Sequence, residues 1–219
     1  MIPDLLTERS SVEEHASSGA GNDSALLLAM TTEHYTLQTA RSATIVESNG
    51  RVSLFLGAVS SSLIAIALVA QVSRFGERFF VLALTLLPAL IFLGGATYVR
   101  AIQNAIEDFE YARAINHIRN WYLGLHPDAP GLFLLSTDET PGGAMQGMTN
   151  PRWQALFTTA GVVAFVMSML VGVTVALAVD AALSLDLYAS AALGFVAGAL
   201  CETALFTHHR SKWREATAS

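Results

Sequence analysis

The sequence predicts an all-α integral membrane protein with four transmembrane helices in two antiparallel hairpins. Four stretches are almost free of charged residues, and each reaches the roughly 20 residues that a helix needs to cross a bilayer. The chain of 219 residues is 53% hydrophobic and only 14% charged, whereas roughly a quarter of the residues in soluble domains are charged. The connections inside each hairpin are short, so consecutive helices are expected to run in opposite directions. Long cytoplasmic helical extensions are expected on the first hairpin.

The expected elements are bounded by changes of charge and by helix-breaking residues. Residues 1–24 hold five acidic residues against one arginine, with several Ser and Gly, and are expected to form a disordered acidic tail. This tail lacks the basic start of a signal peptide, so the first spanning helix is expected to direct insertion. The remaining elements are a cytoplasmic helix over 25–51, transmembrane helices over 52–73 and 79–99, a second cytoplasmic helix over 100–123, a cytoplasmic loop over 124–151, transmembrane helices over 153–179 and 187–207, and a basic cytoplasmic tail over 208–219.

The two segments that flank the first hairpin on its cytoplasmic side are expected to be helical arms. Residues 100–123 contain no Gly or Pro before Gly124 and keep apolar residues at helical spacing, so the second helix should continue unbroken for about 36 Å. Residues 31–47 have the same character, and Asn49-Gly50 is the expected weak point where this arm meets the membrane. The following Pro-Gly pairs predict a loop that rests either on the arms or on the lipid surface.

The distribution of Lys and Arg orients the chain, because these residues are kept on the cytoplasmic side of spanning segments. Nine basic residues flank the spans on one side, and two, Arg74 and Arg78, flank them on the other. Both termini and residues 100–152 are therefore expected in the cytoplasm, in a multi-pass protein of the plasma membrane. The nine are Arg41, Arg51, Arg100, Arg113, Arg119, Arg152, Arg210, Lys212 and Arg214.

Small residues recur every four positions on three of the expected spans, which is the spacing that lets helix backbones approach closely in a bilayer. Such stripes pack helices within one unit or between subunits, or they line a narrow pore. Self-association into a homo-oligomer is expected through them. The stripes are Ser53, Gly57, Ser61 and Ala65 on the first span; Ala160, Ala164, Ser168, Gly172 and Ala176 on the third; and Ser190, Gly194 and Gly198 on the fourth.

Few polar residues lie inside the spans, and each has a structural and a functional interpretation. Ser60, Ser61 and Ser62 cover about 200° of the first helix, so at least one is expected to face protein or water, although each can also bond its own backbone. Pro88 is expected to kink the second helix. Glu202 is the only ionisable residue in a span and lies roughly 7 to 8 Å from its cytoplasmic end, where an inter-helix hydrogen bond and an ion-related role are both open.

No catalytic, nucleotide-binding or metal-binding signature occurs in the sequence, so neither an enzyme nor a cofactor is expected. The single cysteine, Cys201, excludes an internal disulfide framework. His208 and His209 stand beside three basic residues, which favours a tail that meets anionic lipid headgroups over a metal site. The basic residues are too few for nucleic acid. Because no acid, base or His lies at mid-membrane, a proton-coupled transporter is disfavoured.

A resemblance is carried by residues 33–70, EHYTLQTARSATIVESNGRVSLFLGAVSSSLIAIALVA, followed by a second helix and an arm with Asn116, Arg119 and Tyr122. In this arrangement the chain resembles an uncharacterised family of bacterial multi-pass membrane proteins. In layout it is also similar to the membrane hairpins of SLATT and Pycsar-type effectors. The resemblance covers roughly the first 125 residues and implies a pore-forming or membrane-damaging role in bacterial defence. It assigns no functional residue.

Two classes of function stay open from the sequence. The first is an oligomeric pore or channel-like membrane effector. The second is a non-conducting membrane scaffold or accessory subunit whose arms, loop and tail recruit a cytoplasmic protein partner. Membrane lipid is an expected partner in both. The leading polar positions of a pore are Ser60, Ser61, Ser62, Ser168 and Glu202.

Overall fold

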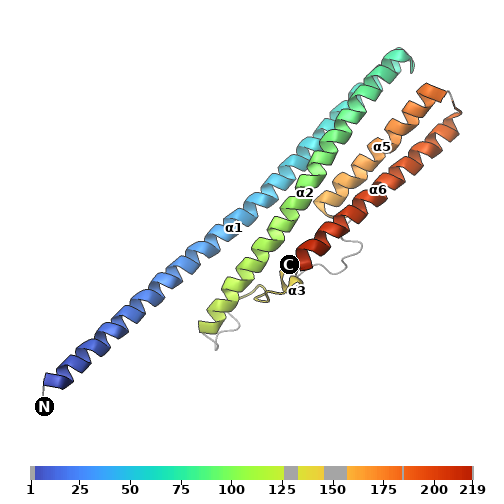
Figure 1. Cartoon of the computed structure of the whole chain (residues 1–219). Helices are drawn as coiled ribbons and strands as arrows, with labels where there is room; N and C mark the ends of the chain where they lie inside the picture. Colours follow the sequence, from blue (N-terminus) through green and yellow to red (C-terminus); the bar gives the residue numbers. More distant parts are fainter. Residues whose placement is uncertain (1–2, 126–132, 146–156, 184, 219) are drawn as a thin grey trace. The chain divides into compact units, whose positions relative to one another are not determined.

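The computed structural model describes residues 3–125, 133–145, 157–183 and 185–218, with side chains described from residue 23 onward. Its helices, labelled in Figure 1, are α1 (Pro3–Ser73), α2 (Glu77–Leu125), α3 (Pro141–Ala144), α5 (Thr159–Leu183) and α6 (Leu187–Ala218). No strand occurs among these residues. The helices α1, α2, α5 and α6 are each long and apolar enough to cross a membrane. The prediction of an all-helical protein with four long apolar helices is therefore confirmed.

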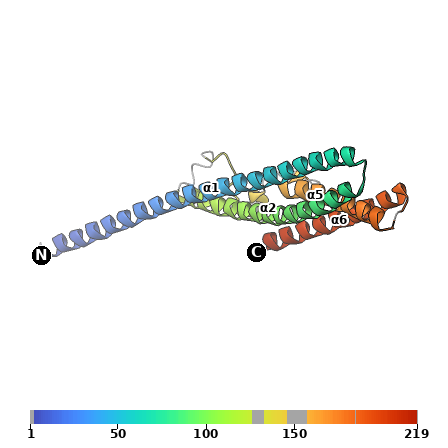
Figure 2. The same cartoon turned by 90° about the horizontal axis from the view of Figure 1, so that it is seen from above.

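A tight turn joins α1 to α2 (Figure 2). α1 ends at Ser73, as the sequence predicts for the first span, and α2 begins at Glu77. Between them, Arg74 and Phe75 have φ angles of 50° and 58°, a left-handed conformation that costs roughly 1 to 2 kcal/mol for each non-glycine residue. The N–H of Phe75 donates to the carbonyl oxygen of Ala70 at 3.1 Å, which satisfies one of the last carbonyls of α1.

The beginning of α1 differs from the expectation. The helix begins at Pro3, whereas residues 1–24 are expected from their composition to be disordered. Pro at the first helical position and Asp4 in the first turn both favour a helix start, and the composition argument takes no account of such local signals. α1 also continues through Asn49 and Gly50 without a break, because a single Gly costs a helix only about 1 kcal/mol.

In the second pair of long helices, α5 and α6, one predicted boundary is confirmed and another is wrong. α6 begins at Leu187 as predicted, and Asp186 caps it by accepting from the N–H of Tyr188 at 3.0 Å. α5 continues to Leu183, four residues past the expected end, so the turn is shorter than predicted. The start of this span, residues 153–156, lies outside the described residues, as do 126–132 and 146–152 of the expected loop.

The expected basic tail is helical, since α6 continues to Ala218. Two of its side chains pack inward. His209 is 5% exposed, and the ring of Trp213 stands edge-on to Phe109 of α2 with 5.7 Å between centroids. The reason is helical spacing: positions 209 and 213 are four apart and share one face of α6.

The chain divides into two compact units, Met1–Ser42 with Tyr111–Ala144, and Ala43–Glu110 with Met145–Ser219. In the second unit, the long helices enclose an apolar core in which Phe55, Leu87 and Val163 are the largest fully buried side chains. α1 and α2 approach closely at Gly94, where an added Cβ would lie 3.0 Å from the ring of Phe55 and 3.3 Å from Met167 of α5. A methyl group added at Gly94 would therefore require the side chain of Phe55 or Met167 to shift by a few tenths of an ångström.

In the first unit, part of the expected loop rests on α2. Asn116, 5% exposed, donates to the backbone oxygen of Asp138 at 2.8 Å. Asn120 donates to the carboxylate of Glu139, also at 2.8 Å. The two arms are joined by a hydrogen bond of 3.0 Å between the hydroxyls of Thr31 and Tyr122. The sequence left open whether the loop rests on the arms or on the lipid surface. Its described part, 133–144, contacts the arm that α2 forms.

Candidate functional site

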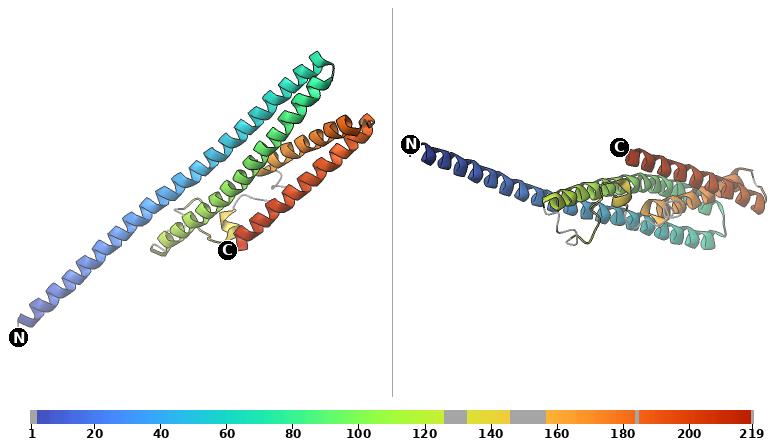
Figure 3. Two further views of the ribbon diagram at one scale, coloured as in Figure 1. Left: turned by 45° about the horizontal axis from the view of Figure 1, so that its top comes forward. Right: turned by 90° about the horizontal axis from the view of Figure 1, so that it is seen from below.

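α5 and α6 lie side by side in the second unit (Figure 3). They meet along a seam of small residues. A Cβ atom added to Gly194 would lie 2.5 Å from the backbone oxygen of Gly172 and 2.8 Å from the Cβ of Ala176. A Cβ added to Gly198 would lie 2.9 Å from the backbone oxygen of Ser168. Real Cβ atoms essentially never come within 3.0 Å of such atoms, so glycine is required at both positions. Two of the three predicted stripes therefore pack against each other within one chain.

The seam continues to the polar pair Ser168 and Glu202. The hydroxyl of Ser168, which is 4% exposed, donates to Oε2 of Glu202 at 3.0 Å. Of the two interpretations open for Glu202, the inter-helix hydrogen bond is present. A carboxylate without a partner is unfavourable at membrane depth. The bond from Ser168 supplies such a partner.

An apolar groove of about 510 Å³ runs beside the seam. Its walls include Phe165 and Met169 of α5 and Phe195 of α6, which are 56%, 58% and 78% exposed. Gly172, Gly194 and Gly198 also line it, and Glu202 is its one ionisable lining residue. The groove is therefore an apolar surface with a single polar end, as expected for a face that meets lipid tails or another helix.

The stripe on α1 has no partner of this kind. Ser53, Gly57 and Ser61 are exposed, and a Cβ added to Gly57 would find nothing within 4 Å. Ser60 is exposed beside them, whereas Phe55 on the other side of the helix is fully buried. The hydroxyl of Ser61 donates to the carbonyl oxygen of Gly57 at 2.8 Å, the local bond that the sequence allows. We refer to Ser53, Gly57, Ser60 and Ser61 as the open face of α1.

The remaining predicted positions do not join a common site. Ser62 is half-buried on α1, and Pro88 is exposed on α2. α2 continues past Pro88 as one helix, although the proline removes the donor that would bond the carbonyl of Leu84. The structure thus separates the serines of α1 from Ser168, which is buried against α6.

A charged cluster between the middle parts of α1 and α2 is absent from the sequence-based predictions. Glu47 accepts hydrogen bonds from Nε and Nη2 of Arg100 at 3.0 and 3.2 Å, and from Nε of Arg51 at 2.9 Å. The bonds from Arg100, followed by those from Arg51, lower the pKa of Glu47 to about 2. The sequence does hold a signal for this pairing. Glu47 precedes the first expected span and Arg100 follows the second, so an antiparallel pair of helices brings the two side chains together.

A hydrogen bond between α2 and α6 is a second feature that sequence reasoning missed. The hydroxyl of Tyr98, a 2% exposed residue, donates to the backbone oxygen of Leu205 at 2.6 Å. The acceptor is a main-chain atom, so no pattern of side chains could have indicated it. This bond ties α2 to α6 near the end of the second expected span and near the end of the fourth.

No group of three or more His, Cys, Asp or Glu that could hold a metal ion lies within the described ranges. No protein-family model, curated protein or solved structure matches this chain. The interpretation of the site therefore depends on its geometry and chemistry.

Proposed function

We propose that the chain inserts into the plasma membrane as two antiparallel hairpins with both termini in the cytosol, and that several copies assemble into a pore or channel-like effector. The observation that carries this proposal is the open face of α1. The stripes on α5 and α6 are occupied by each other, whereas Ser53, Gly57 and Ser61 remain exposed. Small residues on an unpartnered spanning helix favour contact with another helix, and a second copy supplies one.

The polar side chains of the open face support conduction over simple packing. Ser60 and Ser61 place two exposed hydroxyls at the middle of the first span, where lipid offers no partner beyond the local bond that Ser61 already makes to Gly57. The centre of a single chain is filled by Phe55, Leu87 and Val163. A path for ions would therefore lie between copies, with the open face of α1 toward it. The layout resemblance to membrane-damaging hairpins agrees with this assignment.

A flux assay on the purified protein in liposomes tests the proposal. Wild-type protein is expected to release an ion gradient, and Ser61→Leu should reduce the flux at least tenfold because it places a bulky apolar group on the open face. Val81→Leu is the control, since Val81 is 62% exposed on α2 and does not belong to the open face. Liposomes that stay tight with the wild type over a range of voltages and salts would contradict the proposal, as would undiminished flux in Ser61→Leu.

The orientation has its own test in intact cells. In a Cys201→Ala background, a cysteine at Ser73 should react with an impermeant reagent added outside, and a cysteine at Thr137 should not. The reverse pattern would overturn the assignment of the termini to the cytosol. Mass photometry in detergent tests the assembly, and a wild type that is monomeric at every workable concentration would exclude an oligomer.

The first unit favours a scaffold as the second candidate function. Its segment 133–144 is held on α2 through Asn116 and Asn120, while Leu134 and Leu135 are 99% and 62% exposed. Two exposed leucines on an anchored segment fit an apolar pocket of a cytoplasmic protein. A photo-crosslinking residue at position 134 should then give one discrete adduct in cells. The second change Leu135→Asp should remove this adduct. The absence of any discrete adduct would leave the scaffold without support.

A further inference from the structure

The apolar groove beside the α5–α6 seam has the dimensions of a single alkyl chain. It runs along α6 from Ala191 to Glu202, a distance of roughly 16 Å at the helical rise. Its volume of about 510 Å³ over that length corresponds to a mean cross-section of roughly 30 Å². An α-helix with its side chains is about 10–12 Å wide, so its cross-section is roughly three times larger. The carbon atoms of an alkyl chain pack at about 3.5–4.0 Å. The groove therefore seats one extended chain and is too narrow for a helix.

The lining of the groove suits the tail of an amphiphile. The backbones of α5 and α6 meet at its floor, where Gly194 and Gly198 have no side chains to fill it. Apart from Ser168 and Glu202, every lining residue is apolar. In a bilayer this lining alone would not prefer one amphiphile to another, because the surrounding lipid tails are equally apolar. Any preference must therefore come from the polar end.

Glu202 gives that end a chemical preference. Its Oε2 accepts from the hydroxyl of Ser168, and its Oε1 has no hydrogen-bond partner within the described ranges. Glu202 is half-buried, and this Oε1 remains accessible. Because the serine hydroxyl is a neutral donor, it leaves the charge of the carboxylate uncompensated.

No cationic side chain of the groove supplies the missing charge. No Lys or Arg lines it, and Glu202 forms no ion pair with a described residue. A hydrogen bond from an ionised donor to a carboxylate is roughly twice as strong as one between neutral groups. It is stronger still beside hydrocarbon, where the dielectric constant is low. A cationic head with N–H donors therefore fits this end best, and an anionic head would meet a like charge.

We propose that the groove binds a single-chain amphiphile with a primary ammonium head, whose N–H groups donate to Oε1 of Glu202. The head would lie roughly 7 to 8 Å from the cytoplasmic end of the fourth expected span, and the chain would run toward the turn before Leu187. The binding rests on the proposed insertion of α5 and α6 into a membrane, but it does not depend on conduction.

Photolabelling of the full chain in phosphatidylcholine nanodiscs tests the binding. Phosphatidylcholine is the host lipid because its choline head has no N–H donor. The probe is dodecylammonium with a diazirine near the end of its chain, and peptide mass spectrometry locates the label. Label should appear saturably on the groove lining. Unlabelled dodecylammonium should compete at least tenfold better than 1-dodecanol, and laurate should not compete. Labelling that does not saturate, or equal competition by all three, would show mere partition into the bilayer and would overturn the proposal.

Variants place the head of the amphiphile. Glu202→Gln keeps the size of the side chain and removes its charge, so labelling should fall at least tenfold. Glu215→Gln is the matched control, because Glu215 is exposed on α6 and does not line the groove. It should be labelled as the wild type is.

A second pair of variants places the chain and serves as the test if Glu202→Gln fails to fold. Ala199→Phe fills the groove from an exposed lining position and should reduce labelling at least tenfold. Ala192→Phe is its matched control, since Ala192 is exposed on α6 outside the groove. Wild-type labelling in either folded groove variant would refute the assignment. A protein that is labelled as expected but conducts nothing would overturn the pore alone, and one that conducts without saturable labelling would overturn this site alone.

Discussion

Adding one methyl group at Gly194 is expected to force α5 and α6 apart. The new Cβ would lie 2.5 Å from the backbone oxygen of Gly172, whereas ordinary contact begins at 3.4 Å. The difference requires a local separation of roughly 0.9 Å, because the obstructing atom belongs to the backbone and cannot rotate away. A shift of that size along the seam would lengthen the 3.0 Å bond from Ser168 to Glu202 beyond hydrogen-bonding distance.

The expected loss of stability in Gly194→Ala follows from three contributions to the free energy of unfolding. Overpacking a close contact costs about 1 to 3 kcal/mol, and loss of one hydrogen bond costs about 1 kcal/mol. The gain in helix propensity from Gly to Ala offsets about 1 kcal/mol. Gly194→Ala is therefore expected to destabilise the protein by about 1 to 3 kcal/mol. Gly50→Ala is the matched control: it meets nothing within 4 Å and lies outside the open face of α1, so it retains only the propensity gain of up to about 1 kcal/mol.

The assay is reversible unfolding in mixed micelles of increasing SDS content, followed by circular dichroism. The free energy of unfolding should be highest for Gly50→Ala, lower for Gly198→Ala and lowest for Gly194→Ala. The reason is that the three variants require no helix separation, a separation of roughly 0.5 Å and one of roughly 0.9 Å. If Gly194→Ala proves as stable as Gly50→Ala, the seam is not closely packed and the reasoning fails.

Three further changes are expected to have local effects. The pKa of Glu47 is about 2 against a usual 4.5, so the bonds from Arg100 and Arg51 should stabilise the protein fully above pH 4.5 and be lost as the pH falls toward 2. The SDS unfolding midpoint should fall over that window in the wild type but much less in Glu47→Gln. An identical fall in both proteins would refute the assignment. Asn116→Leu should speed amide hydrogen exchange across 133–144, because it removes the buried bond to Asp138; protection equal to that of the wild type would show that this bond does not hold the segment. Tyr98→Phe should destabilise the protein by about 0.5 to 1.5 kcal/mol in the SDS assay, since it deletes the donor to Leu205; an unchanged free energy would mean that water replaces the hydroxyl.

The long helices could be predicted from the sequence because their signal is local. Absence of charge over a sufficient length marks each candidate span, and the turn after Ser73 and the start at Leu187 follow from short polar interruptions. The extension of α5 to Leu183 was missed because Asp180 was interpreted as part of a turn. A single Asp near a helix end does not stop a helix, and the following Ala181 and Ala182 favour its continuation.

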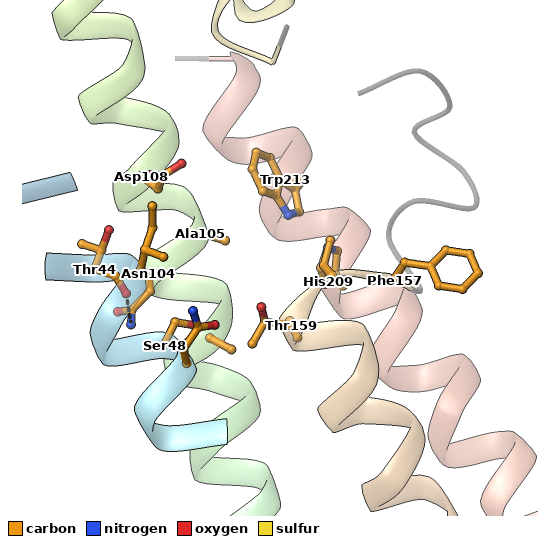
Figure 4. Close-up of a pocket in the computed structure, with 14 residues that line it drawn as sticks. Thr44, Ser48, Asn104, Ala105, Asp108, Phe157, Thr159, His209 and Trp213 are labelled. Atoms are coloured by element: carbon orange, nitrogen blue, oxygen red, sulfur yellow. Dashed lines mark hydrogen bonds between the residues drawn. The ribbon is translucent and has the colours of Figure 1, made fainter. Parts of the chain in front are cut away.

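The contacts of the candidate site could be predicted only in part, because they depend on which faces meet. The stripes indicated that Gly172, Gly194 and Gly198 pack closely, but whether within or between chains was open. The pairing of α5 with α6 decides this for two stripes and leaves Gly57 exposed. The pocket lined by Ser48, Asn104, Thr159 and His209 gave no sequence signal, because its lining combines residues from four separate helices (Figure 4).

The seam also explains why the environment of Glu202 depends on glycines far from it in the chain. Positions 168, 172 and 176 of α5 meet 202, 198 and 194 of α6, so each step of one turn along α5 is matched by one turn in the opposite direction along α6. A slip of one residue would rotate every α6 contact by about 100°. It would carry Glu202 away from Ser168 and replace Gly198 and Gly194 by residues with side chains. The close approach at Gly194 and Gly198 thus selects the register in which the carboxylate finds its hydroxyl, and the polar end of the groove is a consequence of backbone packing two turns away.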